Sequence, residues 1–504
     1  MKIKDRPSLV KIGLYNFKAF KSYTELELDE LTVLAGLNSS GKSSLYQSLL
    51  LLLQSTDSWF TDTNEFRIPA LRLNGKLVEL GAPIEVLSDV NLRVISFSLF
   101  WSNNYHIDYE YILAGNVSEN STTEFENKFL LSKYKVINDK NQVEIETVRS
   151  VTGEWHVAAN TSLGFENTAL LKLIGTNIEH NLKKEFSEVY FDAEEFDPYS
   201  RTVKFDKILN ILFRNTSLVK FKIPISEIVC CLKEQYIKYL DIDALKRDLI
   251  DKNVPSETVD LVNNNQFIHE QIDSVGQIEY IRPFRGYPKR IYTSETGPSP
   301  LSTYPRNRTK IIAYEYDTKI GIIKEGTVED ALKYWLVDYF KLAERIEAYD
   351  TISGLVSEVY LSIDGKKIAI NNVGFGTSQI IPVIYKTLLS RSDLIIIDEP
   401  EIHLHASIQS KLATFFFSMM LIGKKLLLET HSEYLIDKLI YHNILESHDG
   451  MSAKLWWVKK ATSYAIVERM QHDDLGYIAN MPEGFLSEKK LLVEEINKLR
   501  ARKY

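Results

Sequence analysis

Four positions near the N-terminus have the residue types and the spacing that bind phosphate. Gly36 and Gly41 frame the segment GLNSSGKS, and Lys42 and Ser43 close it. Glycines let backbone N–H groups wrap phosphate oxygens, a helix N-terminus adds a favourable dipole, and lysine and serine supply a positive charge and a hydroxyl for Mg²⁺. This spacing predicts a nucleoside triphosphate site formed by Gly36, Leu37, Asn38, Ser39, Ser40, Gly41, Lys42, Ser43 and Ser44.

Two carboxylates lie far downstream, where the apolar run Leu394–Ile397 is followed by Asp398 and Glu399. A buried parallel strand that ends in two carboxylates is typical of the second half of a phosphate-loop site. We expect Asp398 to hold Mg²⁺, directly or through water, together with Ser43. Glu399 would orient or deprotonate the attacking water. A later apolar strand leads to His431, which we expect near the γ-phosphate.

A glycine-rich turn, VGFGTSQ, leads into an apolar helix upstream of these strands. Gly374 and Gly376 permit a close approach of the backbone to a ligand. Thr377 and Ser378 are residue types that cap helices, so the turn is predicted to face an anion.

The elements that must position these residues alternate in type along the chain. LTVLAG reads as the strand before the phosphate loop, and the helix after it is apolar nearly all round, which predicts burial beneath a sheet. Alternating apolar residues then predict several antiparallel strands, and residues 166–275 have a helical texture. The overall pattern predicts an α/β fold with a β-rich subdomain and a helical insertion.

Composition places limits on the class of protein. The chain has 504 residues, 44% of them hydrophobic, and a formal net charge of −8. These values predict a globular protein without a uniformly basic surface, and no segment reads as a signal sequence or a membrane span, so a cytoplasmic location is expected. The only cysteines, Cys230 and Cys231, are adjacent in an apolar stretch, where burial is favoured over a disulfide or a metal site.

Together, the phosphate loop, VGFGTSQ, LIIIDEPEIHLH and ETHSE resemble the ABC-type ATPase heads of the RecF/SMC kind. More closely, they resemble the AAA-labelled ATPases of the prokaryotic OLD-like group, whose C-terminal domain of unknown function resembles DDLGYIANMPEGFLSE. The resemblance implies a P-loop NTPase head in five segments. They are 1–115 with the phosphate loop, 116–165 as a β-rich extension, 166–275 as the insertion, 276–440 as the second half of the head, and 441–504 as a C-terminal extension.

The resemblance also implies roles for individual residues. Two heads would sandwich two ATP molecules with Mg²⁺, and a signature turn from one subunit would face the phosphate loop of the other. Lys42, Glu399 and His431 match the catalytic positions, whereas Glu401, His403 and His405 match an extended motif. The signature positions are Gly374, Gly376, Thr377, Ser378 and Gln379. Gly376 stands where ABC proteins usually carry serine, and Ala406 where this group usually has proline.

Three functions remain open at this point. The first is a dimeric or larger ATP-hydrolysing switch that controls a partner effector, such as a nuclease or toxin, in anti-phage defence. No nuclease site is expected in this chain, because only about seventy residues follow His431. The second is a DNA-binding repair or maintenance ATPase, and the third is an ATP-bound scaffold with little turnover. For the second, a basic segment would face DNA or phosphate through Arg282, Arg285, Lys289 and Arg290, although a solvated basic turn explains the same residues equally well.

Overall fold

The computed structural model describes residues 8–56, 70–102, 104–114, 128–137, 143–149, 155–160, 218–222, 278–283, 285, 292–293, 307–351, 356–445, 451–462, 464–471, 478 and 498. The chain divides into two compact units. The first unit contains residues 1–23 and 47–276, and the second unit contains residues 24–46 and 277–504. Among the described residues, no helix is both long and apolar enough to cross a bilayer.

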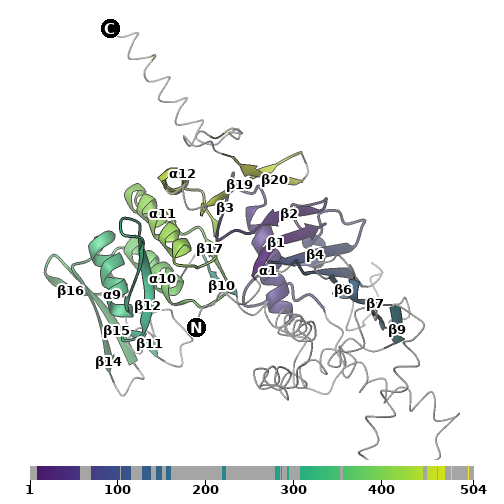
Figure 1. Ribbon diagram of the computed structural model, residues 1–504, viewed down its shortest axis with the longest axis horizontal. Coiled ribbons are helices and arrows are strands. Elements are labelled where there is room, and N and C mark those ends of the chain that lie inside the picture. Colours follow the sequence, from purple (N-terminus) through teal and green to yellow (C-terminus); the bar gives the residue numbers. More distant parts are fainter. Residues whose placement is uncertain are drawn as a thin grey trace, which may run out of the picture. The chain divides into compact units, whose positions relative to one another are not determined.

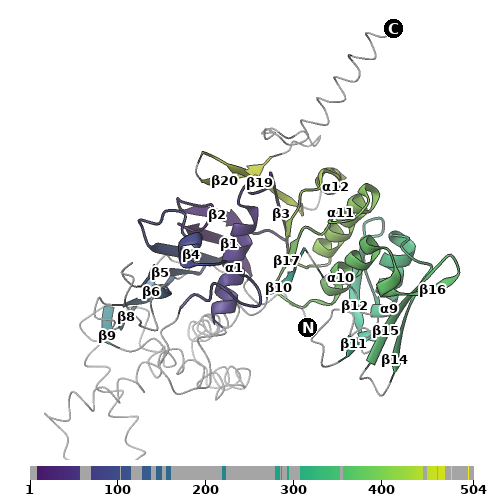
Figure 2. The ribbon, with the colours of Figure 1, turned by 180° about the vertical axis from the view of Figure 1, so that it is seen from behind.

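An antiparallel sheet forms the centre of the first unit. Its strands follow the order β1-β4-β5-β6-β7-β8-β9 (Figure 2). They are β1 (Leu9–Tyr15), β4 (Val94–Trp101), β5 (His106–Leu113), β6 (Phe129–Ile137), β7 (Val143–Arg149), β8 (Trp155–Asn160) and β9 (Leu218–Lys222), with the short helix α2 (Pro83–Val86). The alternation in β5, where Ile107, Tyr109 and Tyr111 are buried, is the signature of a strand with one face on a core.

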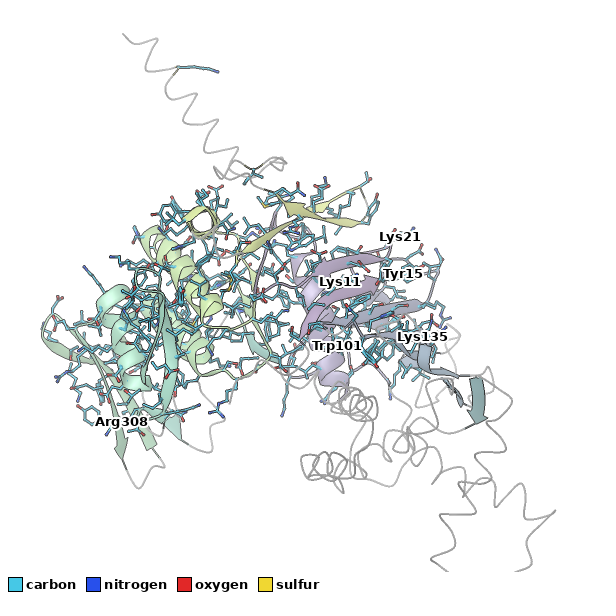
Figure 3. All side chains as sticks on the ribbon, in the orientation of Figure 1. Lys11, Tyr15, Lys21, Trp101, Lys135 and Arg308 are labelled. Atoms are coloured by element: carbon cyan, nitrogen blue, oxygen red, sulfur yellow. The ribbon has the colours of Figure 1, made fainter. Side chains whose placement is uncertain are left out.

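Side chains of this sheet are visible in Figure 3, which labels Lys11 and Trp101. Lys11 places its Nζ 4.2 Å from the centre of the Phe100 ring, on the neighbouring strand. The predicted antiparallel strands are therefore present from residue 94 to residue 160. Within the predicted helical insertion, 166–275, the described residues 218–222 form β9, which extends the same sheet. The helical segments expected there, and Cys230 and Cys231, lie outside the described residues.

A six-stranded sheet forms the centre of the second unit, with the order β10-β17-β18-β3-β19-β20. All neighbours pair in parallel except β19 and β20, which pair antiparallel. The strands are β10 (Ile278–Ile281), β17 (Leu394–Asp398), β18 (Leu426–Glu429), β3 (Leu31–Gly36), β19 (Lys454–Lys460) and β20 (Ala465–Met470). Every residue of β3, β17 and β18 is buried, as expected for parallel strands covered on both faces.

Helices cover this sheet with apolar side chains. They are α10 (Phe375–Leu389), α11 (Ala406–Leu421) and α12 (Glu433–Leu445). Ile384 of α10, Phe416 of α11 and Leu439 of α12 share one core with Val33 and Ile397 of the strands (Figure 1). The helix after the phosphate loop, α1 (Lys42–Thr56), begins in the second unit and continues into the first, and it is largely buried, as its all-round apolar sequence predicts.

The second unit contains further elements outside its central sheet. They are β2 (Thr24–Glu27), β11 (Tyr292–Thr293), β12 (Ile311–Asp317), β13 (Ile322–Thr327), α9 (Val328–Leu332), η3 (Lys333–Tyr339), β14 (Arg345–Thr351), β15 (Val356–Ile363), β16 (Lys366–Ala369) and η4 (Ile370–Asn372). The mixture of a helix-covered parallel sheet with antiparallel sheets confirms the predicted α/β class. The predicted boundary at residue 440 does not coincide with the end of the central sheet, because β19 pairs with β3. The proposed five-segment division is otherwise a prediction.

Candidate functional site

The strand order brings three of the predicted motifs to one edge of the sheet. The phosphate loop follows β3, Glu399 follows β17, and His431 follows β18 by one residue. These strands are parallel neighbours, and Asp398 lies in register with Glu429, which lies in register with Leu34. Because the carboxyl ends of parallel strands meet at the same edge, residues more than 350 positions apart become neighbours there. Figure 1 labels β3 and β17 in this unit.

The phosphate loop adopts the tight turn that its glycines predict. Gly36 has φ +151°, and a Cβ there would lie 2.2 Å from the carbonyl oxygen of Val458 in β19. Gly41 has φ +109°, a region that residues with side chains rarely adopt. Only glycine therefore fits at position 36, where β19 passes close to the loop. The Lys42 Nζ donates to the carbonyl oxygens of Gly36, at 3.2 Å, and Leu37, at 2.9 Å.

The predicted nucleotide-binding residues divide into two groups by exposure. Leu37, Asn38 and Ser39 at the tip are exposed, whereas Ser40, Lys42 and Ser44 are buried against the sheet. The hydroxyl of Ser40 has no hydrogen-bond partner among the described residues. The loop thus combines exposed backbone with a buried ammonium group, which is the arrangement that a polyphosphate chain requires.

Glu429, at the end of β18, is a site residue that the sequence reasoning missed. Ser43 Oγ donates to Glu429 Oε1 at 3.1 Å, and Lys42 Nζ lies 3.7 Å from the same oxygen. The Glu429 side chain is 4% exposed. Its burial, reinforced by the negative charge of Asp398, raises the pKa of Glu429 to about 7. The available signal was positional, because Glu429 ends an apolar strand just as Asp398 does.

Asp398 is held by two tyrosines rather than by the loop serine. Tyr46 donates its hydroxyl to Asp398 Oδ2 at 2.6 Å, and Tyr280 donates to the same oxygen at 3.1 Å. Burial raises the pKa of Asp398 above its usual range, and the two tyrosine hydrogen bonds oppose that shift. Ser43 and Asp398 supply oxygen donors at this edge, and such donors suit Mg²⁺. The residues present therefore fit the predicted cation.

Glu399 and His431 form the partly exposed side of the site. Glu399 Oε1 lies 3.3 Å from His431 Nε2, and their side chains are 29% and 31% exposed. Glu399 has φ +41°, an uncommon conformation for a residue with a side chain and one that recurs at functional sites. Burial and the nearby Lys42 ammonium lower the pKa of His431, so the imidazole is neutral at pH 7.

Glu401 connects the two catalytic segments. The backbone N–H of His431 donates to Glu401 Oε1 at 2.6 Å, and this carboxylate is buried, which raises its pKa. The two histidines of the extended motif have other contacts. His405 caps α11 by accepting from the N–H of Ser407, and the His403 ring packs edge-on against Phe375 at 4.8 Å. Among the described residues, neither histidine joins a group that could hold a metal ion.

Arg285 contacts the backbone of Asp398 and Glu399 instead of lying on a basic surface. Its Nη2 donates to the carbonyl oxygens of Asp398, at 3.2 Å, and Glu399, at 3.3 Å, and its backbone N–H donates to Gln379 Oε1. Burial lowers the pKa of Arg285 to about 10, partly offset by the charge of Glu401. Arg282 is exposed. Lys289 and Arg290, the other members of the predicted basic segment, lie outside the described residues.

The signature turn begins α10, and its polar residues differ in what they contact. Gly374, rather than Thr377 or Ser378, occupies the N-cap position, because its backbone is extended and the helix begins at Phe375. The Ser378 hydroxyl donates to the carbonyl oxygen of Phe375 at 2.7 Å. Ser378 and Gln379 are both 2% exposed. In this structure, therefore, the exposed part of the turn is Gly374, with Gly376 and Thr377 partly exposed.

Steric crowding explains why position 376 is a glycine. A Cβ there would lie 2.6 Å from the carbonyl oxygen of His403, whereas a Cβ at Gly374 would meet nothing within 4 Å. We expect Gly376→Ala to lower the free energy of unfolding by about 1–3 kcal/mol, as overpacking does. Gly374→Ala is the matched control and should leave it nearly unchanged. Urea denaturation of both variants measures this difference, and equal stabilities would contradict the proposed clash.

Comparison with known proteins identifies the family of the chain. Residues 8–436 match the family described as an AAA ATPase domain. No curated protein matches the chain. An Smc head domain with an extended coiled coil bound to the C-terminal domain of ScpA, from Pyrococcus furiosus, is 10% identical, with 97% of this chain and 100% of that chain covered and a TM-score of 0.34. The SMC head domain from Thermotoga maritima is 9% identical, with 92% and 99% covered and a TM-score of 0.33.

These solved structures are too distant to assign a ligand or a partner to this chain. The family match is of a different kind, because it spans most of the chain and includes the phosphate loop, Asp398, Glu399 and His431. It confirms the predicted P-loop ATPase. The chain belongs to the AAA ATPase domain family and is an ATPase of the P-loop class.

Proposed function

We propose that this ATPase is a dimer-forming switch whose nucleotide state controls a partner effector, with a role in prokaryotic anti-phage defence. The observation that carries the enzymatic part is the meeting of Lys42, Ser43 and Asp398 with Glu399 and His431 at one sheet edge. The order of β17, β18 and β3 produces this meeting. The regulatory part rests on the resemblance of the motifs to the OLD-like ATPases.

The reaction is the attack of water on the γ-phosphorus of ATP. The loop N–H groups and Lys42 would bind the phosphates, and Lys42 supplies positive charge in a buried setting. Glu399 would accept a proton from the attacking water, because its carboxylate is partly exposed and beside a neutral imidazole. Ser43 and Asp398 would hold Mg²⁺, which when bound neutralises charge on the phosphate oxygens.

A second subunit would complete the site. Glu399 and His431 are each about three-tenths exposed, so the catalytic side is open to another surface. The exposed Gly374 precedes an apolar helix of 15 residues, and the dipole at a helix N-terminus favours a phosphate presented by another copy. Because Ser378 and Gln379 are buried in their own chain, we assign the contact between subunits to Gly374 and Thr377.

Light scattering on the full chain tests the switch. The Glu399→Gln variant should double in mass with ATP and Mg²⁺, but not with ADP, since ATP persists when hydrolysis is blocked. The matched control is the Glu399→Gln/Lys42→Ala double variant, which should remain at its starting mass because it cannot hold the phosphates. An unchanged mass of Glu399→Gln in ATP would contradict ATP-dependent assembly.

Affinity purification from the native host tests the effector. A tagged Glu399→Gln chain and a tagged Lys42→Ala chain represent the ATP-bound and nucleotide-free states. A nuclease or toxin that is enriched with one bait and absent from the other is the expected result. The same co-purifying proteins in equal amounts with both baits would contradict control by nucleotide state.

A further inference from the structure

Glu429 has a carboxylate oxygen that the phosphate loop does not use. Oε1 accepts from Ser43, but Oε2 is buried and has no hydrogen-bond partner among the described residues. Leaving a charged oxygen buried and unpaired is costly unless a cation or a donor meets it. The Glu429 side chain is 96% buried, being 4% exposed, so bulk water does not supply that partner. Among the described residues, Oε2 is therefore the Glu429 oxygen available to a cation or to a donor.

Glu429 also belongs to a group of three metal-ligating side chains. One ligand atom each from Glu399, Glu429 and His431 lies within 4.8 Å of the others. Ligand atoms about 2.0–2.2 Å from one metal lie about 3–4 Å apart, so a small shift of the side chains from this spacing would let all three contact one ion. The direct separation of 3.3 Å between Glu399 Oε1 and His431 Nε2 falls within that range.

The backbone holds these three residues in place. The N–H of Glu399 donates to the carbonyl oxygen of Glu429 at 2.9 Å, and the N–H of His431 donates to Glu401 Oε1 at 2.6 Å. The N–H of Thr430, between the two ligands on β18, donates to the carbonyl oxygen of Leu34 at 3.0 Å. The backbone around the ligands is thus held by hydrogen bonds, and little ordering of the backbone remains to be done when an ion binds.

We propose that Glu399, Glu429 and His431 form a binding site for a divalent transition-metal cation, distinct from the Mg²⁺ position assigned to Ser43 and Asp398. The ligand types decide the class of ion. An imidazole nitrogen beside two carboxylates suits Mn²⁺ or Zn²⁺, whereas Mg²⁺ prefers oxygen ligands throughout. The charge of a bound cation would also offset the repulsion among the carboxylates. Asp398 and Glu401 add two carboxylates to this region, and Lys42 lies 3.7 Å from Glu429 Oε1.

This site does not depend on the proposed effector control, because its three ligands all come from this chain. The experiment is therefore a titration of the nucleotide-free full chain with Mn²⁺, in excess Mg²⁺, followed by the electron paramagnetic resonance signal of free Mn²⁺. We expect one class of saturable site. Glu429→Gln and His431→Ala should each weaken Mn²⁺ binding about tenfold or more, since a ligand is lost.

The matched controls are an acid and a histidine outside the cluster. Asp437→Asn removes an exposed carboxylate on α12, and His405→Ala removes an exposed imidazole that caps α11. Both should retain the Mn²⁺ affinity of the parent chain. Zn²⁺ should displace Mn²⁺ from the parent, because it is higher in the affinity order for nitrogen-containing sites.

Absence of saturable Mn²⁺ binding would overturn the proposal, and so would an affinity unchanged in Glu429→Gln. If circular dichroism shows that Glu429→Gln is unfolded, His431→Ala decides the question, because its side chain is partly exposed and carries no packing role in the core. Unchanged Mn²⁺ affinity in His431→Ala would then reject the site. The ATPase rate is not the readout, so a failed cation site leaves the switch proposal standing, and an inactive ATPase leaves this titration interpretable.

Discussion

Glu399→Gln is expected to lower the rate of ATP hydrolysis about 10²–10⁴-fold, the usual contribution of a positioned general base. The amide cannot accept the proton of the attacking water, whereas the phosphate loop and Lys42, which bind the nucleotide, are untouched. ATP affinity should therefore stay close to that of the parent. Single-turnover hydrolysis and equilibrium binding of a fluorescent ATP analogue measure the two effects separately.

Two further variants test nucleotide binding and the specificity of the effect. Lys42→Ala should lose nucleotide binding as well as turnover, because it removes the buried ammonium. Glu468→Gln is the control, since its carboxylate pairs with Lys459 at the surface of β20, 2.5 Å from the ammonium, and is 42% exposed. It should hydrolyse ATP like the parent. Hydrolysis by Glu399→Gln at the parental rate would remove Glu399 from its assigned role. An equal loss in Glu468→Gln would show that the effect is not specific.

Arg285→Leu should lower kcat about 10–100-fold in the absence of any nucleic acid. This residue is a positioning residue, because its guanidinium donates to the carbonyl oxygens of Asp398 and Glu399 and its backbone N–H bonds to Gln379. Hydrogen bonds from a charged donor contribute about 1.5–3 kcal/mol, and their loss frees the segment that carries Glu399. Since Arg285 does not reach the loop in this structure, the KM for ATP should change little.

Arg282→Leu is the matched comparison, because Arg282 is exposed and lies only three residues away. It should leave the nucleic-acid-free ATPase rate unchanged. Arg285→Lys should recover part of the lost kcat, since lysine restores the charge but not the forked donor geometry. The alternative function as a DNA-binding ATPase makes the opposite prediction. There, both arginines would affect DNA-stimulated hydrolysis with steep salt dependence, and Arg285→Leu would keep its rate without DNA.

The phosphate loop was readable from the sequence because its chemistry is local. Gly36, Gly41, Lys42 and Ser43 lie within eight positions, and the strand and helix on either side follow from short apolar runs. The same holds for the buried strand before Asp398 and Glu399. Local spacing also gave the helix after the signature turn, although the capping residue was wrong. Gly374 holds that position, and Ser378 bonds within its own first turn instead.

Residue type alone could not separate Arg285 from Arg282. Both lie in one basic segment, and the sequence allowed each to face phosphate or nucleic acid. The structure buries Arg285 against Asp398 and leaves Arg282 exposed. The reason is long-range, because the segment follows β10, which pairs with β17. Likewise, the glycine at 376 is explained only by the carbonyl oxygen of His403, which belongs to another loop.

The sequence by itself determined the P-loop ATPase class and the α/β fold of this protein, and it predicted the residues that would carry the reaction. Only the tertiary structure decided which of them touch. β18 lies between β17 and β3, so Glu429 stands beside Ser43, and Asp398 is held by Tyr46 and Tyr280. Strand order is a property of packing and crossover connections rather than of any local run of residues. For that physical reason, local spacing could not reveal Glu429, whose carboxylate contacts Ser43 and Lys42 of the phosphate loop.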